Sequence, residues 1–206
     1  MKTRSEDSIG AKFSLIVTAL FVLGIGTCQA ASPEVARGRY LVTVMGCTDC
    51  HTPGSFFGRP DKTQFLGGSD VGFAIPGLGV FVPPNLTPDR STGLGKWSPK
   101  EIVKALTTGV RPDGRILAPI MPWPSFAHLS PEDALAIARY LKSLPSVVHQ
   151  VPGPFRPGQT PTLPVMAVIP GSLYATLPAT PAPKSRKRQR RPAPMYHRLR
   201  AVDVRQ

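Results

Sequence analysis

The chain has 206 residues, and its 25 Lys and Arg residues against 12 Asp and Glu residues give a net charge of +13 at neutral pH. This length allows one or two domains. The chain contains 25 prolines and only three cysteines, and so few cysteines exclude the disulfide framework that holds many small secreted domains together.

Residues 1–30 have the pattern of a secretory signal peptide. Lys2, Arg4 and Lys12 precede an uncharged apolar run over residues 13–25, and the small residues around Gln29-Ala30-Ala31 offer a cleavage site. Cleavage there would leave about 176 residues in the mature chain. We therefore predict an exported, periplasmic protein.

Two alternatives concern this N-terminal segment. No charged residue occurs between Phe13 and Pro33, so the segment is nearly long enough to remain as a membrane anchor. Cys28 would be discarded with a cleaved signal, but it would be retained if it carried a lipid. The preceding Ile25-Gly26-Thr27 is a weak match to a lipoprotein processing site.

The first predicted helix covers residues 33–46. Ser32-Pro33 places a hydroxyl at the N-cap and a proline at the first helical position, and Glu34 follows in the first turn. The same Ser-Pro start, with acidic residues after it, recurs at Ser98-Pro99 and Ser130-Pro131. These starts predict further helices over residues 99–109 and 131–143.

Gly38 lies inside the first predicted helix, where glycine costs about 1 kcal/mol relative to alanine. Its presence is explained if another backbone or ring approaches closely, and Tyr140 of the last helix is the candidate. That helix has an apolar face that can pack on the first one, formed by Leu135, Ala138, Leu141 and Leu144.

Cys47, Cys50 and His51 form the run Cys-Thr-Asp-Cys-His, the signature for covalent attachment of a c-type haem. Two thiols at this spacing can each form a thioether with a haem vinyl group, and the following histidine becomes the first axial ligand of the iron. A disulfide or a redox-active pair is the alternative reading of the two cysteines, but neither requires the histidine. We predict one covalent haem c in the chain.

Long segments rich in glycine and proline separate the predicted helices, including residues 73–88 and 111–126. Loops of this length are unusual in a small domain but are explained if they wrap a haem. The aromatic candidates for lining the haem are Phe56, Phe57, Phe65, Phe73, Phe81 and Trp97.

Met121 is the predicted second axial ligand. It lies in Ala118-Pro119-Ile120-Met121-Pro122-Trp123-Pro124, where the prolines stiffen a loop that can hold the sulfur over the iron. His128 is the main rival, and His149 and His197 are less favoured by their positions.

Residues 147–183 are predicted to be a Pro-rich linker, because recurring prolines forbid long helices and interior strands. Within it, residues 165–175 are a candidate for docking on the domain formed by residues 31–146. Residues 31–183 hold 13 basic and 9 acidic side chains, so most of the charge lies elsewhere.

Residues 184–206 hold nine Lys or Arg residues against Asp203 alone. Such a run predicts a solvated, disordered tail. A functional tail could instead hold the protein near anionic lipid headgroups or dock an acidic redox partner. Nucleic-acid binding fits this composition but conflicts with export.

Four motifs resemble one branch of the class I c-type cytochromes. They are Asn85-Leu86-Thr87-Pro88-Asp89, Gly93-Leu94-Gly95-Lys96-Trp97-Ser98, Gly109-Val110-Arg111-Pro112-Asp113-Gly114 and Met121-Pro122-Trp123-Pro124. Together with the haem motif, they are similar to a single haem domain of the cytochrome c subunits of bacterial membrane-associated dehydrogenases for alcohol, gluconate or aldehyde. The similarity covers about residues 35–145.

This resemblance implies an all-α cytochrome c fold, with three to four helices and long loops around one haem. It also implies covalent attachment through Cys47 and Cys50, with His51 and Met121 as axial ligands. The resembling subunits commonly carry three such domains, whereas this chain has one haem motif.

Two functions follow from the two possible states of the sixth coordination position. If Met121 binds the iron at its sixth coordination position, no site is open for a substrate. We then expect a one-electron carrier or redox subunit, not an enzyme, working between a dehydrogenase and a downstream cytochrome or oxidase. If the sixth ligand is labile, the alternative is a haem enzyme or gas sensor of the peroxidase type.

Overall fold

The computed structural model describes residues 32–178. The predicted signal peptide and the predicted basic tail, with Cys28 and His197, lie outside these residues. The described chain forms two compact units divided after Val168. The first unit contains every element discussed below except the short helix α7 (Gly171–Tyr174), which belongs to the second.

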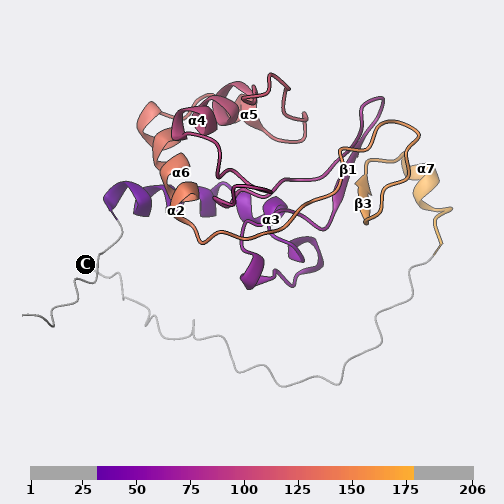
Figure 1. Cartoon of the computed structure of the whole chain (residues 1–206). Coiled ribbons are helices and arrows are strands. Elements are labelled where there is room, and N and C mark those ends of the chain that lie inside the picture. The colour runs from indigo at the N-terminus through magenta and orange to yellow at the C-terminus, as the bar shows by residue number, and fades with distance from the viewer. Residues whose placement is uncertain (1–31, 179–206) are drawn as a thin grey trace, which may run out of the picture. The chain divides into compact units, whose positions relative to one another are not determined.

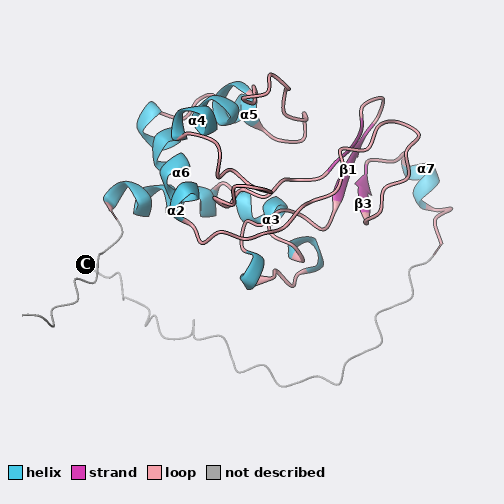
Figure 2. Cartoon of the chain, viewed as in Figure 1, coloured by secondary structure: helices cyan, strands magenta, loops and turns pink. Residues whose placement is uncertain are grey.

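The three predicted helices are present with nearly the predicted ends. They are α2 (Pro33–Val44), α4 (Pro99–Thr108) and α6 (Pro131–Ser143), shown in Figures 1 and 2. Two shorter helices, α3 (Cys47–His51) and α5 (Trp123–Phe126), and two 3-10 turns (Ser55–Phe57 and Lys62–Gln64) lie between them. The longest of these helices has 13 residues, and none within residues 32–178 has the length and apolar character to cross a bilayer.

The Ser-Pro pairs begin the helices by capping free backbone N–H groups. The Ser98 hydroxyl accepts a hydrogen bond from Glu101 N, and the Glu101 carboxylate accepts one from Ser98 N at 2.7 Å, which completes a capping box. Ser130 accepts from Asp133 N in the same way. The Asp133 carboxylate does not return to its own helix start, because it binds Arg37 of α2.

Helices α2 and α6 pack together at Gly38, as predicted. A Cβ atom on Gly38 would meet the carbonyl oxygen of Ala136 and would lie 2.7 Å from Cβ of Tyr140. Around this contact lies the main hydrophobic core of the first unit, with Leu41, Val42, Leu66, Leu94, Ile102, Ile137, Ala138, Tyr140 and Leu141.

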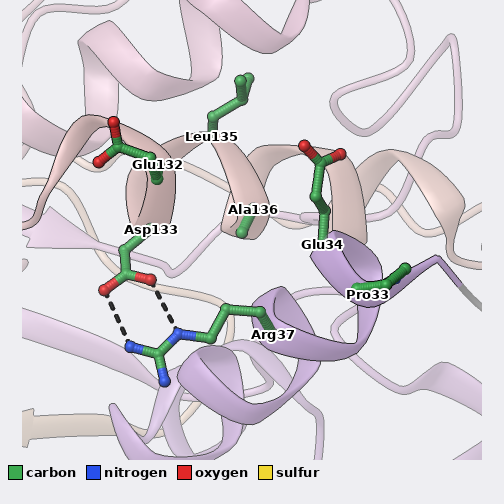
Figure 3. A pocket seen from close by; sticks show the side chains of 7 residues that line it. All are labelled: Pro33, Glu34, Arg37, Glu132, Asp133, Leu135 and Ala136. Atoms are coloured by element: carbon green, nitrogen blue, oxygen red, sulfur yellow. Dashed lines mark hydrogen bonds and ion pairs between the residues drawn. The ribbon is translucent and has the colours of Figure 1, made fainter.

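Two ion pairs flank the same helix interface. Figure 3 shows Arg37 of α2 reaching Asp133 of α6, with hydrogen bonds of 2.8 and 3.0 Å to the two carboxylate oxygens. Arg139 of α6 pairs with Glu34 of α2. Arg37, Arg139 and Glu34 are exposed and Asp133 is half-buried, so solvent screens both pairs and each contributes little stability.

A small sheet completes the first unit, which departs from the all-helical expectation. Strands β1 (Gly72–Ile75) and β2 (Gly79–Phe81) form an antiparallel hairpin, and β3 (Val165–Ala167) pairs in parallel with the other edge of β1. The segment 73–88, predicted as loop, therefore begins with a hairpin. Strands of three or four residues are too short for a detectable alternation of apolar and polar residues.

The first part of the predicted linker folds onto the domain. Pro164 O accepts a hydrogen bond from Gly72 N at 2.9 Å, and Phe155 exchanges two backbone hydrogen bonds with Val80. Prolines exclude this segment from the interior of a sheet, and β3 is accordingly an edge strand.

Candidate haem site

The haem motif forms the short helix α3, directly after α2. Gly46 turns the chain between the two helices with a positive φ of 68°, a conformation that favours glycine. Cys47 and Cys50 are half-buried, and His51, the last residue of α3, is buried. One short helix therefore carries all three residues that the sequence assigned to haem attachment.

The ring of His51 is oriented by a backbone carbonyl. Its Nδ1 lies 2.7 Å from Pro84 O. Because a carbonyl can only accept, Nδ1 carries the proton and Nε2 keeps the lone pair that binds a metal. Burial lowers the pKa of His51 to about 4, which keeps the ring neutral at physiological pH.

The carbonyl that orients the ring is distant in the sequence. The loop directly after His51 offers nearer carbonyls, such as those of Pro53 and Pro60. The acceptor belongs instead to Pro84, 33 residues further along the chain.

Both thiols of the haem motif have raised pKa values. Burial raises the pKa of Cys47 to about 11, and burial followed by the charge of Asp49 raises the pKa of Cys50. Redox-active Cys-x-x-Cys pairs have the opposite property, because a lowered pKa makes their thiolate reactive. The environment of this pair therefore does not favour the reactive thiolate that a redox-active dithiol needs.

Met121 lies half-buried at the end of a closed loop. Gly109 ends α4, and Leu117 N returns to Gly109 O at 2.8 Å, which closes the loop at its base. Within residues 32–178, the main chain of Met121 bonds only to its neighbours Ala118 and Trp123.

The rival histidines differ in their surroundings. His128 is exposed just before α6. His149 is half-buried, and its Nδ1 lies 2.7 Å from Gly67 O.

The aromatic candidates for the haem lining are spread over several environments. Phe73 is buried and packs edge-on against Phe56, with 5.4 Å between ring centres. Phe81 and Trp97 are half-buried, whereas Phe57 and Phe65 are exposed.

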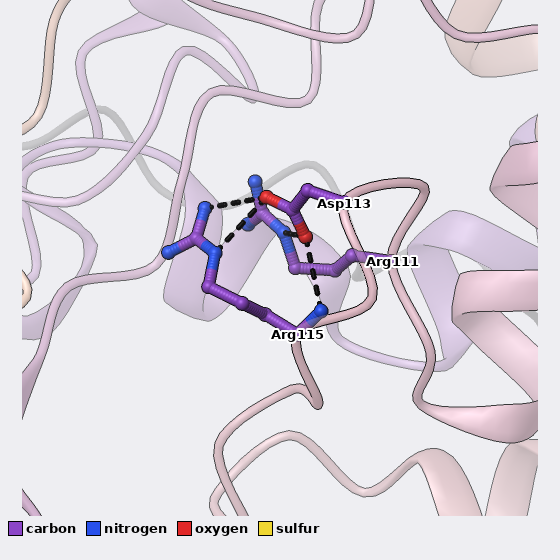
Figure 4. Close-up of polar contacts among 3 residues, drawn as sticks. All are labelled: Arg111, Asp113 and Arg115. Atoms are coloured by element: carbon purple, nitrogen blue, oxygen red, sulfur yellow. Dashed lines mark hydrogen bonds and ion pairs between the residues drawn. The ribbon is translucent and has the colours of Figure 1, made fainter.

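Arg111 is a candidate functional residue that the sequence reasoning did not single out. Its guanidinium lies over the Trp97 ring, 5.4 Å from the ring centre. Its Nε is buried and has no hydrogen-bond partner within residues 32–178. Figure 4 shows Asp113 between Arg111 and Arg115, and it hydrogen-bonds Arg115 at 2.7 Å.

Asp113 does not satisfy the buried nitrogen of Arg111. The Nε–Oδ1 separation is 3.4 Å, which is an ion-pair distance without hydrogen-bond geometry. A buried donor of this kind is costly unless it finds an acceptor, and a carboxylate is the acceptor that arginine prefers. A haem brings two propionate carboxylates, so the Arg111 environment fits the cofactor that the motif implies.

The comparison with protein families agrees with this geometry. Residues 35–145 match the family described as cytochrome c. The chain belongs to the cytochrome c family. Covalently bound haem c is therefore the cofactor that the family implies, and the predicted cytochrome c fold is confirmed.

Curated relatives are cytochrome subunits of bacterial dehydrogenases. The chain is 34% identical over 134 residues to the fructose dehydrogenase cytochrome subunit of Gluconobacter japonicus, a match that covers 62% of this chain and 26% of the relative. It is 35% identical over 127 residues to the gluconate 2-dehydrogenase cytochrome c subunit of Pantoea cypripedii, covering 62% and 27%. The chain thus spans about a quarter of these relatives.

A further relative is named for carrying two haems. It is a diheme cytochrome c-type protein of Cereibacter sphaeroides, 30% identical over 112 residues, with 54% of this chain and 36% of the relative covered. The resemblance to dehydrogenase cytochromes expected from the four motifs is confirmed by the subunits named above.

Proposed function

We propose that this chain is an exported mono-haem cytochrome c that carries single electrons from a dehydrogenase to a downstream cytochrome or oxidase. The main support for the proposal is the arrangement of residues in α3. Cys47 and Cys50 lie on this helix together with His51, a buried, neutral histidine whose ring is oriented by Pro84 O. The electron-transfer subunits among its relatives support the same class of function.

When bound, the haem supplies a site that gains and loses one electron. Cys47 and Cys50 would hold it through two thioethers, and His51 Nε2 and the Met121 sulfur would bind its iron. Arg111 Nε, beside Trp97, would donate to a propionate. The thioether of Met121 is soft and neutral, so it raises the reduction potential relative to a second histidine.

The first experiment records the absorption spectrum of the oxidised protein after c-type maturation. We expect the weak far-red sulfur-to-iron band in the wild type and its loss in Met121→Ala. Met166→Ala is the matched control, because Met166 is 46% exposed in β3, outside the loop that holds Met121. It should keep the band.

The absence of the band in the wild type would refute Met121 as the ligand. Coordination by His128, or an open site for catalysis or gas binding, would then follow. Carbon monoxide separates these two results, because only a five-coordinate haem binds it rapidly in the reduced protein.

The partners proposed for this chain are a dehydrogenase donor and a cytochrome or oxidase acceptor. If Met121 fills the sixth coordination position, the iron would have no open site for a substrate, and we propose that the chain is a non-enzymatic subunit. Co-purification of the full chain with a dehydrogenase, followed by reduction of its haem when the dehydrogenase substrate is added, tests this assignment. A haem that stays oxidised while the dehydrogenase turns over would contradict it.

A contact with an anionic membrane surface is proposed for the C-terminal part of the chain. Large apolar side chains are exposed repeatedly before the basic tail, at Val168, Leu173, Tyr174 and Leu177. Apolar residues followed by nine Lys and Arg residues supply a hydrophobic and an electrostatic contribution to peripheral membrane binding. Each basic residue near an anionic membrane surface contributes about 1 kcal/mol of binding free energy.

Vesicle sedimentation tests this contact. The full chain should bind vesicles that contain phosphatidylglycerol at low salt and should be released from them at high salt. It should not bind vesicles of phosphatidylcholine alone. A chain ending at Pro183 that binds equally well would refute a role for the tail. Binding to a purified acidic protein but not to anionic vesicles would assign the tail to partner docking.

Export is proposed from residues 1–30. Mass spectrometry of the mature protein should find an N-terminus after Ala30. A retained N-terminal segment would identify a membrane anchor, and an N-terminal lipidated Cys28 would identify a lipoprotein.

A further inference from the structure

Residues 146–168, here called the strap, lie beyond the part of the chain that matches the cytochrome c family. They nevertheless belong to the same compact unit as α3. The strap runs along two chain segments, residues 66–69 and 83–89, and these are the segments that surround the carbonyl partner of His51.

The two segments are joined to each other on both sides of Pro84. Ser69 N donates to Pro83 O at 3.0 Å, and Leu86 N donates to Leu66 O at 2.9 Å. The first segment also reaches the haem motif, because Gly68 N donates to His51 O at 2.9 Å. The position of Pro84 O therefore depends on how these two segments are held.

Asn85 connects Pro84 to the strap. The side chain is only 1% exposed, and its Nδ2 donates to Val147 O at 2.7 Å. Its Oδ1 accepts from Thr87 N at 2.9 Å. Because a backbone N–H can only donate, this contact fixes which end of the amide faces the strap.

The backbone N–H groups of Val147 and His149, and the His149 ring, complete the network. Val147 N donates to Thr87 Oγ1 at 3.1 Å, and His149 N donates to Thr92 Oγ1 at 3.2 Å. The ring of His149 reaches the other segment, with Nδ1 at 2.7 Å from Gly67 O. Residues 147–149 therefore hold both segments at once, and Asn85 is the residue next to Pro84.

We propose that the strap is a positioning element for the proximal histidine, acting through Asn85 and His149 to hold Pro84 O on the ring of His51. The proposal rests on the proposed role of His51 as an iron ligand. A strong hydrogen bond at Nδ1 makes an imidazole a better donor to its metal, which stabilises the oxidised iron and lowers the reduction potential. Loosening the strap weakens this bond and raises the potential.

The test uses the full haem-loaded protein and two variants of the network. His149→Ala removes the ring that binds Gly67 O. Asn85→Leu keeps the approximate volume of the side chain, adds no charge and removes both Nδ2 hydrogens. If the buried Asn85→Leu change prevents folding, His149→Ala still tests the proposal.

Two readouts separate positioning from general stability. One is the midpoint potential, measured by spectroelectrochemical titration. The other is hydrogen exchange of the His51 ring N–H in the reduced protein, followed by NMR. A weakened contact, worth about 1 kcal/mol for one hydrogen bond, should speed this exchange about fivefold and shift the potential upward.

Gln150→Ala is the control within the strap, because within residues 32–178 the Gln150 amide donates only to the adjacent Val151 O. Ile137→Val is the control for stability, because it trims the buried core and costs about 1 kcal/mol. Both controls should keep the wild-type potential and ring exchange.

Unchanged potential and exchange in His149→Ala would overturn the proposal, and so would equal shifts in Ile137→Val. A wild-type protein that lacks covalent haem would instead refute the proposed function. A variant with the wild-type haem spectrum and an unchanged potential refutes the strap proposal alone.

Discussion

Replacing Gly38 by alanine should destabilise the protein, although alanine is the better helix former. The added Cβ would meet the Ala136 carbonyl oxygen and would lie 2.6 Å from the Ala136 carbonyl carbon. These are backbone atoms of α6, which cannot rotate away as a side-chain end can. Helices α2 and α6 would have to move apart across the interface that contains Leu41 and Ile137.

Two opposing effects set the size of the change. Exchanging glycine for alanine inside a helix gains about 1 kcal/mol. Overpacking a core contact costs about 1–3 kcal/mol, and a clash with backbone belongs at the upper end of this range. The expected net loss is therefore about 2 kcal/mol in the free energy of unfolding. For a folded unit of about 140 residues, this corresponds to a Tm lower by about 7 °C.

Thermal unfolding of the haem-loaded protein, followed by circular dichroism, measures this loss. Ala36→Gly is the matched control, because Ala36 is exposed on the same helix and the change there tests helix propensity alone. It should lose about 1 kcal/mol. A Gly38→Ala protein as stable as the wild type, or more stable, would refute the close-approach argument.

Three further changes test separate parts of the molecule. Arg111→Leu should lower the reduction potential by roughly 60 mV, about 1.4 kcal/mol for one electron, because it removes a cation that favours the reduced haem. Asp89→Asn should lower the Tm at pH 7 and flatten its dependence on acid pH. Hydrogen bonds from Ser91 and Thr92 depress the pKa of Asp89, so its contribution is present above pH about 4 and is lost as the pH falls through the lower pKa of the folded state. Ser98→Ala should cost about 1 kcal/mol in chemical denaturation, because the α4 N-cap is lost.

The outcomes that contradict these expectations are equally specific. Arg115→Leu is the control for Arg111, since Arg115 also binds Asp113 but is 59% exposed, and equal potentials in the two variants would remove Arg111 from the haem site. An Asp89→Asn protein with the wild-type acid profile would contradict the depressed pKa. A Ser98→Ala protein as stable as the wild type would show that the cap is redundant.

The features that could be predicted from the sequence are those whose signals are local. Each Ser-Pro pair specifies a cap and a first helical residue within a few positions, and α2, α4 and α6 begin where these pairs predict. The haem motif is equally local, because its three residues lie on one short helix. Gly38 was informative because glycine inside a helix is unfavourable without a packing reason.

The features that could not be predicted depend on contacts between distant residues. Pro84 lies 33 residues after the ring that it orients, and nothing in the local sequence distinguishes its carbonyl from those of Pro53 and Pro60. Arg111 belongs to a recognised motif, but its buried nitrogen is visible only once Trp97 is placed beside it. The site residues Cys47, Cys50, His51 and Met121 stay predictions until a haem-loaded protein is measured.

The strap also affects the order in which the chain folds. Its hydrogen bonds join residues 62 and 82 positions apart, through Asn85 and Gly67. Closing such long loops costs conformational entropy before any contact is gained. Capped helices, by contrast, form from contacts between residues that are close in the sequence. We therefore expect the helices to form early and the strap to dock last. Until it docks, we expect the segment around Pro84 to lack the hydrogen bonds that Asn85 and Thr87 make with the strap.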